Sequence, residues 1–409
     1  MTRDFEGGPD ARAALPRLIA IPAPDFEREH WGRVPLLTRA AELGQDFTDL
    51  FSLEAVDELV ANRAIRTPFV RMANEGDLLA PSRYTSPSGF GAEVSDQLDA
   101  DKVLAEFAGG ATLVLQGLHR TWSPLRDFTR TLVQELGHPA QVNAYVTPAS
   151  SRGFDPHYDV HDVFVIQVHG EKHWTIHEPA HVDPLRDQPW SDHAEAVAAR
   201  AQGEPAIDAT FAPGDVLYLP RGWIHSATAL GGTSIHLTIG VAAMTRWDIV
   251  EEIMATLKAD PRLRDALPVG VAGLGEASID DLVAETVRAI TASLSENGGG
   301  ASVASALQRR LSTSTRPEPV RPISTAEQLA TIGAVHWRAG LEASLQRTET
   351  EIRIVARSKT VALPLEAADA VEALAAGGSH DAADLPGLDP ASSLVVARRL
   401  VREGILVLG

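Results

Sequence analysis

Residues 155–167 read DPHYDVHDVFVIQ, and this stretch decides how the rest of the chain is interpreted. It places His157 and Asp159 two positions apart, just before a run of Val, Phe and Ile. On a β-strand, residues i and i+2 point to the same side, so one imidazole and one carboxylate can reach the same ion from one segment. The H-x-D pair alone is a weak signal, since chance supplies many. It becomes a metal site only if a third ligand comes from elsewhere in the fold.

A second stretch, PGDVLYLPRGWIH at residues 213–225, supplies that third ligand. Turn residues stand on either side of a short apolar strand, and the second turn brings His225 to the start of the next strand. Two histidines and one carboxylate on one face of an octahedral ion leave three positions open, as in the facial triad of non-haem Fe(II) oxygenases. A bidentate 2-oxo acid would fill two positions and dioxygen the third. We therefore predict His157, Asp159 and His225 as the catalytic metal ligands of a 2-oxoglutarate-dependent oxygenase.

The co-substrate needs a cation for its distal carboxylate, and Lys172 is the candidate. It is predicted to begin a strand after a turn at Gly170; an ordinary exposed turn lysine is the alternative. Asn143 and Tyr145 alternate on an upstream strand and could hydrogen-bond the same ligand. His236 alternates with apolar residues and is predicted to line the barrel interior, either beside the ligands or as plain packing.

The pattern of residue types around these motifs predicts mixed α and β structure. Short runs rich in Val, Ile, Thr and aromatic residues predict an antiparallel barrel or sandwich; they are Val142–Thr147, Val163–Val168, His173–His177, Asp215–Leu219 and Ser234–Val241. Helical spacing precedes them at Leu50–Asn62 and Leu125–Leu136 and follows them at Trp247–Lys258 and Ile279–Leu294. Asn297–Gly300 predicts a break, and Thr313–Pro322 a linker. Helices and a small hairpin after residue 323 predict a winged-helix-like domain.

Composition limits the possible functions. With 55 acidic and 36 basic side chains, the net charge of −19 disfavours nucleic acid as a partner and favours basic proteins, although solubility alone would also account for it. There is no cysteine, so thiolate metal sites and cysteine nucleophiles are excluded. No signal peptide or membrane span is expected, which makes the cytoplasm the default location.

Four stretches resemble the JmjC-type ribosomal oxygenases of the cupin superfamily. They are Phe26–Leu37, Val142–Pro179, Gly214–His225 and Ile235–Ile239. The resemblance implies a double-stranded β-helix (jelly-roll or cupin) JmjC domain with N-terminal helices at residues 1–245. It further implies a helical dimerisation segment at 246–312 and a winged-helix-like domain at 323–409, and hence a homodimer.

The resemblance also carries over to single residues. His157, Asp159 and His225 match the family's Fe(II) ligands, and Lys172 matches the lysine that binds the distal carboxylate of 2-oxoglutarate. The asparagine and tyrosine of the preceding strand match Asn143 and Tyr145. One departure is Gly240, where some members carry a serine, and it removes a polar contact from the pocket. His161 shares the H-x-D face, but we assign it a structural role rather than ligation.

The resemblance implies hydroxylation of an arginine or histidine side chain of a ribosomal protein, a basic partner that suits the acidic chain. Two alternatives are an oxygenase of the same chemistry acting on a small metabolite or peptide, and a metal-binding cupin that is no oxygenase. The latter would not need the cation at Lys172. A DNA-binding regulator is disfavoured because residues 325–409 carry eight Lys and Arg against eleven Asp and Glu.

Overall fold

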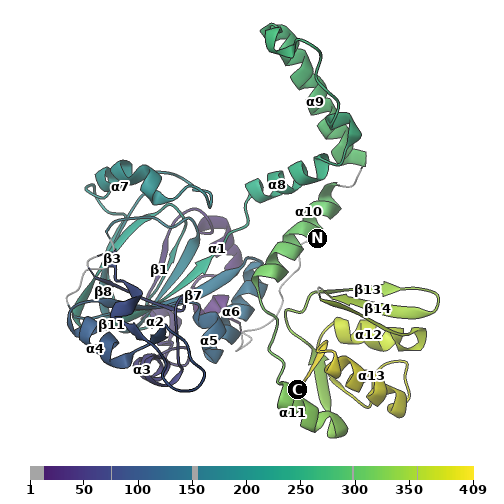
Figure 1. The fold of residues 1–409 in the computed structure, drawn as a ribbon, viewed down its shortest axis with the longest axis horizontal. Helices are drawn as coiled ribbons and strands as arrows, with labels where there is room; N and C mark the ends of the chain where they lie inside the picture. The colour runs from purple at the N-terminus through teal and green to yellow at the C-terminus, as the bar shows by residue number, and fades with distance from the viewer. Residues whose placement is uncertain (1–12, 75, 150–154, 297–298, 357) are drawn as a thin grey trace. The chain divides into compact units, whose positions relative to one another are not determined.

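The computed structural model describes residues 13–74, 76–149, 155–296, 299–356 and 358–409 (Figure 1). They divide into two compact units, a first that ends at Ala243 and a second that spans Met244–Gly409. The predicted break at Asn297–Gly300 lies partly outside the described residues. Within the described ranges, no helix is both long and apolar enough to cross a membrane.

The first unit is built on one large antiparallel sheet. Its strand order is β1-β10-β8-β11-β7-β6-β2-β3, and β9 pairs with β8. The bounds are β1 Leu36–Thr38, β2 Val70–Asn74, β3 Asp77–Leu78, β6 Thr112–Leu115, β7 Ala140–Thr147, β8 Asp162–His177, β9 Ile207–Phe211, β10 Val216–Leu219 and β11 Ile224–Val241. A separate pair consists of β4 Thr85–Ser86 and β5 Gln97–Leu98.

Helices precede and interrupt these strands. They are α1 Ala23–Glu29, α2 Ala40–Leu43, α3 Leu53–Asn62, α4 Ala100–Ala108, α5 Leu118–Thr121, α6 Ser123–Leu136 and α7 Ala194–Arg200. The helices predicted at Leu50–Asn62 and Leu125–Leu136 are thus α3 and α6. Helix α6 stops at Gly137, whose left-handed backbone (φ +70°) ends the helix.

Strand β8 differs from the prediction. The sequence suggested two strands separated by a turn at Gly170, whereas the structure has one continuous strand. Its first half pairs with β10 and its second half with β9, while β11 follows it along both halves. Opposite Gly170, strand β11 carries extra residues between Leu230 and Ile235, so both strands bend together. Lys172 therefore lies inside a strand rather than at its start.

The two faces of β8 contact different apolar clusters. Phe164, Ile166 and Val168 pack into the large core shared with the N-terminal helices. Val163 and Val165 belong to a smaller cluster on the other face of the strand. Because both faces are buried, this half of the strand is apolar at nearly every position, unlike a half-exposed strand. The predicted mixed fold with an antiparallel cupin-type sheet is confirmed, and its inner face is where the candidate site lies.

The second unit combines helices with two three-stranded sheets. Its helices are α8 Arg246–Leu257, α9 Glu276–Glu296, α10 Gly299–Ser314, α11 Pro322–Gln328, α12 Ala368–Ala375 and α13 Pro390–Arg402. The first sheet consists of β16 Ser379–Asp381, β12 Ala334–Trp337 and β17 Leu406–Leu408. The second sheet consists of β13 Ala343–Arg347, β14 Glu351–Ala356 and β15 Lys359–Pro364. The predicted hairpin is β14–β15, and the winged-helix assignment stays a prediction.

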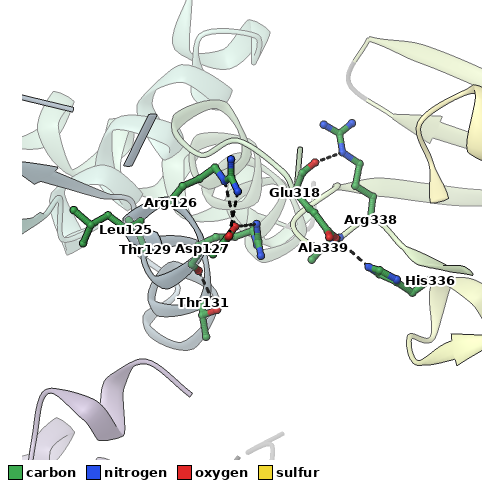
Figure 2. A network of polar contacts seen from close by, with 10 residues as sticks. Leu125, Arg126, Asp127, Thr129, Thr131, Glu318, His336, Arg338 and Ala339 are labelled. Carbon is green, nitrogen blue, oxygen red and sulfur yellow. Dashed lines mark hydrogen bonds and ion pairs between the residues drawn. The ribbon is translucent and has the colours of Figure 1, made fainter. Parts of the chain in front are cut away.

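The predicted linker before this domain is tied to it by polar contacts. The carboxylate of Glu318 accepts hydrogen bonds from His336 Nε2 at 3.1 Å and from the Ala339 amide at 3.2 Å, and Arg338 donates to the Glu318 carbonyl (Figure 2). These contacts fix residue 318 against β12 and the turn that follows it. The segment between α10 and α11 is thus anchored at its centre.

Candidate active site

A cavity of about 390 Å³ opens on the inner face of the sheet. Its walls come from β2, β3, β6, β7, β8, β10 and β11, from the segment that precedes β8, and from the insertion between β8 and β9. His157, Asp159, His225 and Lys172 all line it. A cavity of this size is typical of small-molecule sites, and four chemically active side chains converge on it.

The H-x-D segment is fixed by backbone hydrogen bonds rather than by membership of a strand. His157 and His225 exchange both amide-to-carbonyl bonds, at 3.2 and 2.8 Å, in an isolated bridge. The Asp159 carbonyl accepts the Gly222 amide at 3.0 Å. The prediction that His157 and Asp159 lie on a strand is therefore wrong in detail, because β8 begins only at Asp162. The bridge brings the two stretches together instead.

The turn that precedes His225 is stabilised by hydrogen bonding to Asp162, which is fully buried. One carboxylate oxygen accepts the Arg221 amide at 2.9 Å, and the other accepts the Tyr218 hydroxyl at 3.1 Å. Burial raises the pKa of Asp162. The first residue of β8 thus anchors the turn at 220–222, which connects β10 to the start of β11, where His225 lies.

The two imidazoles are oriented for ligation through Nε2. Their ring centroids lie 4.4 Å apart. His157 Nδ1 lies 2.7 Å from the Asp155 carbonyl, and His225 Nδ1 lies 3.1 Å from the Trp223 carbonyl. A carbonyl can only accept, so each Nδ1 carries a proton, and in the neutral ring Nε2 then carries the lone pair. This is the tautomer that a divalent metal requires of a histidine ligand.

The carboxylate of Asp159 completes the set, in an open arrangement. Its Oδ2 lies 3.9 Å from His225 Nε2. Two ligands at right angles on an ion with bonds near 2.1 Å would stand about 3 Å apart. In the described part of the chain, no three His, Asp or Glu side chains are already closed around one point. Closing this pair takes a shift of about 1 Å, and Asp159 is the more exposed member of the pair.

Electrostatics hold this group in the protonation states that a metal needs. Burial and then the neighbouring His157 lower the pKa of His225 to about 4. Burial raises the pKa of Asp159, but the surrounding His161, His225, His157 and Arg71 outweigh it, and the net pKa is lowered. At neutral pH the site thus presents a carboxylate and a neutral imidazole.

Lys172 is a buried basic residue of the cavity and is only 3% exposed. Its Nζ donates to Thr147 Oγ1 at 3.2 Å and lies 6.0 Å from the Trp174 ring centroid. Among the described residues, no carboxylate pairs with it. Burial lowers the pKa of Lys172 to about 7. An ammonium buried without a counter-ion is strongly disfavoured, so this position is suited to an incoming anion.

Tyr145 and His236 form one stacked pair in the cavity wall. They are cross-strand partners on β7 and β11, with ring centroids 4.9 Å apart and planes within 4°. The His236 ring also meets Trp174 edge-on at 5.3 Å. Burial first, then Lys172 and His225, lower the pKa of His236 well below its usual value. His236 is therefore a neutral wall residue beside Lys172.

Asn143 is the predicted site residue that the structure does not bring into this cavity. Its Oδ1 accepts the Gly117 amide at 3.0 Å, and it is absent from the described residues that line the cavity. It shares the Tyr145 face of β7, as predicted, but its side chain fixes the segment before α5. A role in co-substrate binding therefore stays a prediction for Asn143.

Arg71 and Trp190 are among the lining residues that the sequence analysis did not single out. Arg71 lies on β2, far upstream of the motifs, and places a second cation in the wall. Trp190 comes from the insertion between β8 and β9, and its ring centroid lies 6.3 Å from that of His157. No motif spacing connects either residue to the triad, so only the three-dimensional arrangement reveals them.

The glycine at position 240 leaves room for the side chain of His161. A Cβ at position 240 would lie 2.6 Å from His161 Nε2, so the imidazole occupies the space that a side chain would need. His161 Nδ1 in turn lies 3.9 Å from Asp159 Oδ2. The glycine and the histidine thus form a matched pair next to the carboxylate.

Comparison with known proteins shows what these features are similar to. Residues 120–249 match the JmjC domain family. Ribosomal oxygenase 1 of Gallus gallus is 30% identical over 273 residues, which cover 64% of this chain and 43% of that protein. The bifunctional lysine-specific demethylase and histidyl-hydroxylase NO66 of Drosophila persimilis is 28% identical over 269 residues, covering 64% and 37%. The chain thus spans less than half the length of these curated relatives.

A solved structure resembles almost the whole chain. The ribosomal oxygenase YcfD of Escherichia coli aligns with 95% of this chain and 98% of its own, with a TM-score of 0.54 and 18% identity. At that identity the likeness concerns the fold. Together, these comparisons make the chain similar to the ribosomal oxygenases, with a match to the JmjC domain over residues 120–249.

Proposed function

We propose that this chain is an Fe(II)- and 2-oxoglutarate-dependent oxygenase that hydroxylates an amino-acid side chain of a ribosomal protein. The single observation that carries the proposal is Lys172, a buried ammonium without a described carboxylate partner, in the same cavity as His157, Asp159 and His225. A triad supplies a metal, and the lysine supplies the counter-charge of a dicarboxylate. Together they match the needs of this co-substrate.

His157, Asp159 and His225 would hold the metal. Two imidazoles that present Nε2 in their neutral form and one carboxylate would fit Fe(II), and three protein donors would leave room for a co-substrate on the ion. The carbonyls of Asp155 and Trp223 fix the ring orientations through Nδ1. When bound, Fe(II) with 2-oxoglutarate supplies the chemistry that activates dioxygen for hydroxylation of a C–H bond.

Lys172 would bind the distal carboxylate of 2-oxoglutarate, with Thr147 beside it as a hydroxyl donor. A carboxylate next to Lys172 favours the charged ammonium and so raises its pKa again. The stacked rings of Tyr145 and His236 line the same cavity, where they would exclude water from the bound co-substrate. Two solved structures of YcfD from Escherichia coli are complexes with cobalt and either 2-oxoglutarate or succinic acid.

The alternative cupin function, metal binding without oxygenase activity, fits this cavity less well. Such a protein has no use for a buried cation, and an unpaired buried charge destabilises the fold. A small-molecule substrate remains the second candidate for the same chemistry, because about 390 Å³ would also hold a metabolite beside 2-oxoglutarate. We favour a ribosomal protein because the relatives are named ribosomal oxygenases and the chain is strongly acidic.

The test is incubation of the full chain with Fe(II), 2-oxoglutarate and a mixture of extracted ribosomal proteins. The expected result is succinate release and one protein that gains the mass of one oxygen atom. Asp159→Ala should abolish both. Asp208→Ala, which removes a surface carboxylate paired with His173, is the matched control and should leave both intact. Equal turnover in the Asp159 variant would refute the assignment.

We also propose that the helical segment forms a homodimer. Helix α9 exposes Ile279, Val283 and Val287, three apolar side chains that recur every four residues along one face. Helix α8 likewise exposes Trp247 and Met254. Apolar stripes of this kind mark interaction surfaces, and a second copy with the same stripe would cover them. We further propose that the C-terminal domain is a winged-helix domain and that the protein is located in the cytoplasm.

A further inference from the structure

Arg71 is a second cation in the cavity wall that the proposed reaction does not use. It lies on β2 and lines the cavity together with the triad. Its Nε is buried and has no hydrogen-bond partner among the described residues. No described carboxylate forms an ion pair with it either. Its guanidinium hydrogen-bonds Tyr145, and it opposes the rise in pKa that burial causes for that residue.

The positive charge of Arg71 would remain without a counter-charge even with Fe(II) and 2-oxoglutarate bound. Among the described lining residues, Asp159 is the one carboxylate, and the proposed metal uses it. The charges of Fe(II), Asp159, doubly ionised 2-oxoglutarate and protonated Lys172 cancel. Arg71 stays charged at any physiological pH. The space left for a substrate therefore carries a net positive charge, and the guanidinium that supplies this charge has a buried N–H donor without a described partner.

This remaining charge discriminates between possible target side chains. A guanidinium or ammonium entering the cavity would meet a like charge in a partly desolvated space and would find no free carboxylate there. An uncharged side chain with an acceptor, such as a neutral imidazole or an amide, would instead accept the Arg71 N–H. An unsatisfied donor rejects a group that cannot accept from it.

On the basis of the proposed function, we infer that Arg71 is a specificity-determining residue that selects an uncharged, hydrogen-bond-accepting side chain and excludes arginine and lysine from the reacting position. This narrows the choice left open by the sequence, in which arginine and histidine targets were equally allowed. The residue acts by direct contact with substrate and not by holding the metal.

The inference can be tested by binding, without turnover. The full chain is loaded with Mn(II) and 2-oxoglutarate, and the probes are N-acetyl, N-methylamide derivatives of histidine, glutamine and arginine at about pH 8, where free histidine is neutral. Mn(II) enhances the proton relaxation of any probe whose side chain enters the cavity. We expect enhancement for histidine or glutamine about tenfold above that for arginine.

Arg71→Gln removes the charge and should erase this selectivity, whereas Arg71→Lys should keep the exclusion of arginine. Arg63→Gln, which breaks a surface pair with Glu58, is the matched control. Thermal melts of all variants establish that they fold. Equal or stronger enhancement of the arginine probe in wild type would overturn the inference, as would no enhancement of any probe.

A third result would reassign the residue. If Arg71→Gln lost 2-oxoglutarate but kept its preference among the probes, Arg71 would belong to the co-substrate site and the inference would be wrong. Failure of the wild type to bind Mn(II) or 2-oxoglutarate would instead refute the proposed function itself. The two failures are therefore distinguishable.

Discussion

Replacing Lys172 with methionine should stabilise the protein without its ligands. Burial lowers the pKa of Lys172 from its ordinary 10.5 to about 7, so the folded state binds this proton more weakly than the unfolded state. Below about pH 7 both states carry the charge, and the folded state bears the full penalty of about 5 kcal/mol at 1.4 kcal/mol per pKa unit. The penalty declines between about pH 7 and 10.5 and vanishes above that range.

Methionine keeps the unbranched apolar stem and removes the charge. It also removes the hydrogen bond to Thr147, which contributes about 1 kcal/mol. The free energy of unfolding should therefore rise by about 3 to 4 kcal/mol at pH 6.5 in Lys172→Met, and the gain should shrink to less than about 1 kcal/mol at pH 9.5. The same change should abolish binding of 2-oxoglutarate, because its distal carboxylate would lose its counter-charge.

Urea denaturation followed by tryptophan fluorescence at the two pH values measures this difference. Lys102→Met is the matched control, since Lys102 reaches the carbonyls of Ser82 and Thr85 near the surface, and its effect should not change with pH. A destabilised Lys172→Met at pH 6.5, or a gain that stays constant with pH, would refute the picture of a buried, uncompensated ammonium.

Three further predictions concern the site and the helical segment. The affinity of the Mn(II)-loaded protein for 2-oxoglutarate should fall as pH rises above about 7, because binding must then protonate Lys172; calorimetry in two buffers should detect the proton uptake, and constant affinity up to pH 9 would contradict it. Gly240→Ser should cost about 1 kcal/mol because it displaces His161, and His161→Ala should cancel most of that cost in a double-mutant cycle; additive effects would mean that the two do not share the space. Val283→Glu in the exposed stripe of α9 should convert the proposed dimer to a monomer in light scattering, and an unchanged mass would argue against that interface.

Much of the fold follows from local sequence signals. The alternation of apolar residues and the G-D and P-R-G turns predicted the antiparallel sheet and brought His225 to the start of β11, where the structure has it. Gly170 misled the prediction, because a glycine between two apolar runs normally marks a turn. In the structure Gly170 lies at a bend in one long strand, and this bend depends on extra residues in β11. The sequence of β8 alone does not predict those residues.

The site was predictable only where its residues share a strand or a motif. Lys172 and Tyr145 could be assigned from spacing and alternation, and both line the cavity. Asn143 has the same alternation, but the Gly117 amide, distant in sequence, occupies its oxygen. Arg71 has no local signal, because it reaches the cavity only through the pairing of β2 with β6 and of β6 with β7.

The central claim is best tested by equilibrium dialysis of Mn(II) against the purified chain and its three ligand variants. We predict a single tightly held ion per wild-type chain, and loss of that site in each of His157→Ala, Asp159→Ala and His225→Ala. Wild-type affinity and stoichiometry in any one of these variants would contradict the account, because the ion would then be held by other side chains.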